Sequence, residues 1–366
     1  LRIYPVNSKI ENAIILKGNI LEPGSAEWKP GIKFYDLINE ENIRLNTDMD
    51  TAAIVRENNY DKTKEIIYIN LQKEMDSRTS SIELEARDEI IVFSTHDSRS
   101  NILADVVQQF KLQSTANKPP NTVELKGFFK HNGVFPLQKN TRLSDLIKIS
   151  GGLQIGTDRN YALLFRRNNL DGSYTPLHIK LNETLTNPQS DHNPIIQPLD
   201  RVYFFDFQID RDQMLKPEIE AIIKQAKADQ PSKVVEIKGP VFQPGRYPMT
   251  AGMNIQALID AAGGMKEQAY TESATLTRDN LIQQQYSKIS SFNVRMLDSD
   301  SEFNLATRLQ AGDFLVIREK PEWNKSSQTV TITGEVKFPG TYKIAKRETI
   351  CSFIRRIGGF NEDAYL

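Results

Sequence analysis

The chain has 366 residues, which is more than one hydrophobic core usually organises, so several domains are expected. With 39% hydrophobic and 25% charged residues, its composition excludes the disordered and fibrous classes. Forty-six basic and 47 acidic residues leave a formal charge of −1, so the charge signature of a nucleic-acid binder is missing and no nucleic-acid partner is expected. The sequence shows no apolar run of about 18 residues that would predict a membrane-spanning helix.

The chain contains an internal repeat in which each unit opens with a β-hairpin. Four short apolar strands end in a glycine, and a turn follows five or six residues later. The glycines are Gly18, Gly127, Gly239 and Gly334, and the turns are Pro23-Gly24, Asn132-Gly133, Pro244-Gly245 and Pro339-Gly340. These glycines and prolines are interpreted as backbone geometry rather than ligand contacts.

A short amphipathic helix follows each hairpin. Its marker residue stands 19 positions after the opening glycine, and in three units a Gly-Gly pair begins 24 positions after it, where a left-handed helix end is expected. The markers are Leu37, Leu146, Leu258 and Phe353, and the pairs are Gly151-Gly152, Gly263-Gly264 and Gly358-Gly359. Unit one has Asn42 instead of a first glycine, which predicts a different loop and a left-handed asparagine.

Two charged landmarks continue the repeat beyond the helix. Arg56, Arg166 and Arg278 each follow an apolar strand, and Asp88, Asp200 and Asp313 each precede the last strand of their unit. The favoured interpretation is an ion pair between the arginine and the aspartate of one unit. The alternative is that these arginines contact a neighbouring subunit or an acidic sugar.

The resulting order is hairpin, helix, strand, hairpin-like segment, strand, which predicts an α+β fold of tandem β-grasp modules joined by helical or short linkers. The expected divisions are 1–12 as the end of a preceding module, repeat one at 13–93, a helical linker at 94–121, repeat two at 122–205, a helical linker at 206–232, repeat three at 233–318, a short linker at 319–328 and a truncated repeat four at 329–366. We expect repeat four to be mobile or completed by a neighbouring chain, because it lacks later strands.

Two phrases give the chain a family resemblance. Residues 239–248 (GPVFQPGRYP) and 334–342 (GEVKFPGTY) resemble soluble-ligand-binding β-grasp (SLBB) domains, in the multi-repeat form of bacterial outer-membrane polysaccharide (capsule or exopolysaccharide) export proteins. The resemblance implies a periplasmic location, a homo-oligomeric ring around an export conduit, and polysaccharide and inner-membrane export machinery as partners. It also implies attachment to the outer membrane through segments absent from these residues. Since the sequence starts at Leu1 without a signal peptide, we expect a mature or excised fragment.

No catalytic residue, cofactor site or metal site is predicted. The sequence contains no phosphate-binding glycine loop, nucleophile elbow or zinc helix, and its four histidines, His96, His131, His178 and His192, lack ligand spacing. Cys351 is expected to be buried and inert. Tyr203, Phe204 and Phe205 are assigned to the core rather than to sugar stacking. A soluble-ligand binder without a transport role, or an enzyme using paired carboxylates, is the alternative to an export scaffold.

Overall fold

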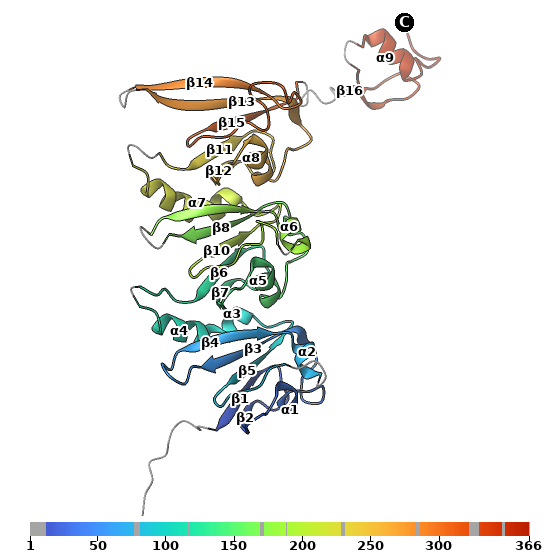
Figure 1. Ribbon diagram of the computed structural model, residues 1–366. Helices are drawn as coiled ribbons and strands as arrows, with labels where there is room; N and C mark the ends of the chain where they lie inside the picture. The colour runs from blue at the N-terminus through green and yellow to red at the C-terminus, as the bar shows by residue number, and fades with distance from the viewer. Residues whose placement is uncertain are drawn as a thin grey trace, which may run out of the picture.

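The computed structural model describes residues 12–76, 81–115, 117–168, 172–187, 189–227, 231–282, 286–321, 329–345 and 348–365. Between residues 12 and 321, three modules of similar fold are stacked in a column (Figure 1). Most of the segment 1–12, predicted as the end of a preceding module, and most of the linker predicted at 319–328 lie outside the described residues.

Each of the three modules contains a five-stranded mixed sheet. Module one consists of β1 (Ala13–Gly18), β2 (Gly24–Glu27), α1 (Phe34–Leu37), β3 (Thr47–Glu57), β4 (Lys64–Ile69), α2 (Leu71–Met75) and β5 (Glu89–Ser94). Module two consists of β6 (Thr122–Gly127), β7 (Gly133–Pro136), α5 (Leu143–Ile149), β8 (Ala162–Arg167), β9 (Tyr174–Ile179), α6 (Leu181–Thr186) and β10 (Arg201–Phe204). Module three consists of β11 (Val234–Lys238), β12 (Gly245–Pro248), α8 (Ile255–Ala261), β13 (Ala269–Ile282), β14 (Tyr286–Arg295) and β15 (Phe314–Glu319).

The strand order is the same in the three sheets: β2-β1-β5-β3-β4, β7-β6-β10-β8-β9 and β12-β11-β15-β13-β14. The first and last strands of each module lie side by side and run parallel, whereas the other neighbours are antiparallel. Parallel neighbours need a crossover connection, and the segment containing the helix supplies it. The predicted α+β fold is therefore confirmed.

The structure departs from the sequence predictions in three details. The short helices α2 and α6 were not predicted. Strand β13 continues past Arg278 to Ile282, so this arginine does not end its strand. Asn42 is not among the described residues with positive φ, so the predicted left-handed asparagine is wrong. The Asn42 side chain instead donates to the Leu37 carbonyl at 2.6 Å, which satisfies the end of α1 in another way.

The opening glycine of each complete module is required by a close approach of two backbones. Gly18, Gly127 and Gly239 have φ of 90°, 93° and 106°, a region that favours glycine. A Cβ atom at these positions would lie 2.0, 2.0 and 1.9 Å from a carbonyl oxygen of the last strand. The glycine thus lets the first strand cross closely beside its parallel partner.

Both faces of the sheets in modules one and two are buried. In β3, Ala52 and Ile54 belong to the core of module one, whereas Ala53 and Val55 belong to a second core shared with module two. This second core also contains apolar residues of the connector helix α4 (Ala104–Leu112), which follows the short helix α3 (Arg99–Ile102). Modules one and two therefore share one continuous hydrophobic core.

The same alternation joins module two to module three. Phe204 faces the core shared with module one, while Tyr203 and Phe205 face a core built with the connector helix α7 (Arg211–Lys224) and module three. All three side chains are buried, as predicted. Each of the three complete modules thus forms part of one continuous packed body.

Unit four contains a two-stranded sheet, β16 (Thr329–Ile332) and β17 (Gly340–Lys343), and one helix, α9 (Ile350–Arg356). Phe353 is buried, but Cys351 is exposed, so the predicted burial of this cysteine is wrong. Two positions along a helix turn the side chain by about 200°, which places Cys351 away from the face of Phe353. The prediction that unit four is mobile or completed by a neighbouring chain stays a prediction.

Replacing the opening glycine of module three by alanine should destabilise the module far more than the same replacement at a glycine that has free space around it. In Gly239→Ala the new Cβ meets the Ile317 carbonyl, which adds about 1–3 kcal/mol of overpacking to about 1–2 kcal/mol of left-handed strain. At Gly264 φ is 91°, but a new Cβ would have no atom within 4 Å, so Gly264→Ala adds only the left-handed strain. Urea unfolding of the two variants measures the difference; equal free energies of unfolding would contradict this role.

Candidate functional site at the module junctions

The three arginines that recur in the repeat, Arg56, Arg166 and Arg278, form ion pairs within their own modules. The guanidinium of Arg56 donates to Asp88 at 3.0 and 2.7 Å, and the corresponding distances are 3.2 and 2.8 Å for Arg166–Asp200 and 2.8 and 2.7 Å for Arg278–Asp313. Each aspartate is buried and also accepts a backbone N–H three residues before it. The hydrogen bonds to the aspartates raise the pKa of Arg56 and Arg278.

These pairs confirm the ion-pair interpretation of the arginines. Each Nη2 also donates to a backbone carbonyl of the same module, at 3.0, 2.8 and 3.3 Å for Arg56, Arg166 and Arg278. The three guanidinium groups lie in three separate modules and do not converge on one site. Contact of these arginines with a neighbouring subunit or an acidic sugar stays a prediction.

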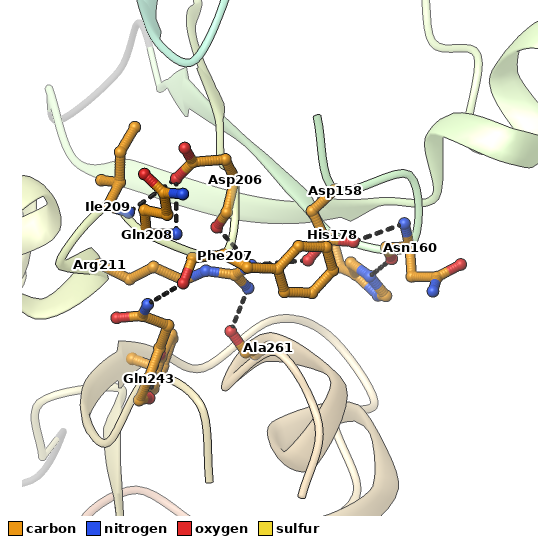
Figure 2. Close-up of polar contacts among 11 residues, drawn as sticks. Asp158, Asn160, His178, Asp206, Phe207, Gln208, Ile209, Arg211, Gln243 and Ala261 are labelled. Carbon is orange, nitrogen blue, oxygen red and sulfur yellow. Dashed lines mark hydrogen bonds and ion pairs between the residues drawn. The ribbon is translucent and has the colours of Figure 1, made fainter. Parts of the chain in front are cut away.

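A second set of arginines, which the sequence analysis missed, lies between the modules. Arg211 begins α7 and its side chain is fully buried, with the guanidinium against the rings of Phe205 and Tyr161 at 5.1 and 5.5 Å. Figure 2 shows that this guanidinium donates to Asp158 of module two at 2.6 Å and to the Ala261 carbonyl of module three at 2.6 Å. One charged group therefore joins the two modules.

Arg99 repeats this arrangement between modules one and two. It begins α3, pairs with Asp48 of module one, and donates to the carbonyls of Ile149 and Lys148 of module two. Its guanidinium lies 5.1 Å from the Phe93 ring, and burial lowers its pKa to about 10, so the group stays charged at neutral pH. In both junctions the acceptor carbonyls lie at the end of a helix, where cations are favoured.

The junctions also contain two open clefts at corresponding positions. Cleft 2–3, between modules two and three, has a volume of about 470 Å³. Apolar and polar residues line it, and the polar ones include His178, Lys180, His192, Asn254, Gln256 and Asp260. Cleft 1–2 has a volume of about 370 Å³ and is lined among others by Tyr68, Asn70, Gln138, Lys139, Asp145 and Lys148. Such mixed hydroxyl, amide and charged groups suit a hydroxyl-rich soluble ligand.

Two histidines give cleft 2–3 its own chemistry. Nε2 of His178 lies 3.1 Å from the Asn160 carbonyl, and the rings of His178 and His192 are in edge contact at 5.7 Å (Figure 2 shows the first contact). Burial lowers the pKa of His178. In cleft 1–2 the corresponding residue is Tyr68, whose hydroxyl donates to the Pro136 carbonyl at 2.9 Å. Among the residues that the structure describes, no group of three or more candidate ligands for a metal ion is present.

Comparison with known proteins identifies modules two and three and unit four. The model of the SLBB domain matches residues 123–177, 234–284 and 329–366. No curated protein matches the chain. The chain is an α+β protein with tandem SLBB modules, and module one, which the family model does not match, has the same strand order as modules two and three. Within the described ranges, no helix has the length and apolar character needed to cross a membrane.

Loss of the junction arginine should destabilise the chain strongly. Arg211→Met leaves Asp158 and the Ala261 carbonyl buried without their donor, and breaking a buried pair in this way costs about 3–5 kcal/mol. Arg295→Ala is the matched control, because its side chain is 66% exposed and should change stability by no more than about 0.5 kcal/mol. Urea denaturation followed by circular dichroism measures both. A similar loss of unfolding free energy in the two variants would show that Arg211 does not stabilise the junction.

The junction of modules one and two should lose stability in acid through His131. Its Nε2 is buried without a hydrogen-bond partner, and burial, Arg99 and Lys130 lower its pKa against the opposing effect of Asp97. Because the folded-state pKa is depressed, the unfolded chain takes up the proton first, so stability is complete above about pH 6.5 and falls as the pH decreases towards the folded pKa.

His131→Gln should reduce this loss, since Gln243 occupies the corresponding position of module three and donates to the Phe207 carbonyl at 2.9 Å. The exposed His96→Gln is the control, and His178 accounts for part of the remaining acid sensitivity. The measurement is the free energy of unfolding at pH 7.5 and 5. An unchanged pH dependence in His131→Gln would show the account of this histidine to be wrong.

Proposed function

We propose that this chain is the periplasmic part of an outer-membrane polysaccharide export protein, in which the stacked modules act as an assembly scaffold or as the wall of a conduit. The observation that carries the proposal is the continuous packing of modules one to three, the second and third of which match the SLBB domain, through shared cores and buried arginines. A conduit wall must hold its shape over a long distance. Modules joined by flexible linkers would not provide that rigidity.

The proposal includes partners and a location. The chain forms a homo-oligomer in the periplasm, associates with the outer membrane, and meets polysaccharide and inner-membrane export machinery. The match to SLBB domains supports this through the resemblance of the repeats to export proteins. No catalytic step is assigned to the chain, and the arginine pairs serve the fold of each module.

Ring assembly of the complete gene product tests the proposal. We expect a defined oligomer in detergent by light scattering and rings by electron microscopy, because a single column cannot enclose a conduit. Arg211→Met should reduce the oligomer fraction by weakening the column, whereas Arg295→Ala should not. A strict monomer in detergent would contradict the scaffold.

A soluble-ligand binder is the second candidate, and the two clefts at the module junctions favour it. Their lining groups come from two modules each, so a bound ligand would stabilise the junction. This function requires no ring. A monomer that binds an oligosaccharide in these clefts would move the assignment from scaffold to binder.

A further inference from the structure

A basic pocket lies on module two where the end of α7 meets the edge strand β9. It has a volume of about 630 Å³. Its lining includes Tyr174, Ile222, Gln225 and three lysines, Lys224, Lys227 and Lys233. The lining residues that the structure describes include no aspartate or glutamate. This basic pocket is separate from cleft 2–3, with which it shares no lining residue.

Among the residues that the structure describes, no carboxylate pairs with the three lysines. All three are exposed, and within the described part of the chain their ammonium groups form no ion pair. The buried Glu218 of α7 is already bound by Arg201 at 2.8 Å and by the Tyr203 hydroxyl at 2.7 Å. The positive potential of the pocket is therefore available to an anion.

Apolar side chains and neutral hydrogen-bonding groups also line the basic pocket. Tyr174 packs on the core and has the Arg201 guanidinium over its ring at 4.9 Å, while Ile222 is a buried residue of the lining. Thr175, Ser232 and Gln225 supply hydroxyl and amide groups. A lining that combines apolar side chains, a few neutral polar groups and cations suits a ring-shaped ligand that carries both hydroxyls and negative charge.

We propose that the basic pocket binds a carboxylated sugar, an assignment that deepens the proposed function and rests on it for the choice of a saccharide. The lysines pair with the carboxylates, and the neutral groups hydrogen-bond the ring hydroxyls. Gln225 is the C-cap of α7, so the negative end of the helix dipole lies in the pocket. This end favours hydroxyl donors of the ligand and opposes any anion, so the lysines must supply the whole attraction for the carboxylate.

Calorimetric titration of the full chain with a short oligogalacturonate tests the proposal. The comparison ligands are a neutral maltooligosaccharide of the same length and inorganic phosphate. We expect binding of the oligogalacturonate that weakens as salt is raised, and no comparable binding of the other two ligands. Equal affinity for the neutral sugar, or for inorganic phosphate, would overturn the assignment to a carboxylated sugar.

Lysine variants locate the binding. Lys224→Gln/Lys227→Gln/Lys233→Gln should weaken oligogalacturonate binding by about tenfold or more, because it removes the three cations of the described lining. The control Lys111→Gln/Lys118→Gln removes exposed lysines from the connector of modules one and two and should keep the affinity. The substituted side chains are exposed, so the thermal midpoint should not change. Unchanged affinity in the triple variant would place the anion elsewhere and overturn the proposal.

The result of the binding experiment can be distinguished from the result of the ring-assembly experiment. Rings without oligogalacturonate binding would leave the scaffold intact and refute only the sugar assignment. Binding without rings would support the pocket and contradict the scaffold. The two measurements therefore test the two proposals separately.

Discussion

A buried guanidinium at each junction is the interaction on which the column of three modules depends. Arg99 and Arg211 each contact an aspartate of the preceding module and a helix-end carbonyl of the following one. A charge removed from water is tolerated only when its partners are in place, so these contacts fix the relative position of the modules. The aromatic rings beneath the guanidinium groups add cation–π attraction and exclude water.

The shared cores supply the apolar part of the same junctions. Since successive residues of a strand point to opposite faces, a central strand with apolar residues at every position must be covered on both sides. In β5 and β10 the second cover comes from a connector helix and the next module. In β13 the outer positions are Thr275 and Thr277, which are only partly buried, and among the described residues the shared core extends no further than module three. The clefts and the basic pocket lie beside these junctions, where two modules or a module and its connector meet.

The local fold could be predicted because each landmark has a local physical cause. Gly239 is needed where two backbones nearly touch, and the spacing between Arg278 and Asp313 repeats because both serve one module. The bridging arginines were missed, although Arg99 and Arg211 also recur at corresponding positions, because a single charged residue in a polar linker resembles a solvated one. Their role depends on partners about 50 residues away, which no local pattern reveals. Cys351 was assigned wrongly because the sequence does not show which face of α9 is covered.

The most direct test of the rigid column is the distance distribution between spin labels on modules one and three. Tyr60 and Leu297 are highly exposed positions for the labels, in a background with the exposed Cys351 replaced by serine. The shared cores and bridging arginines predict a single narrow distribution, as expected for one packed body. A broad distribution in the otherwise unaltered chain would show that the modules move independently and would contradict the account.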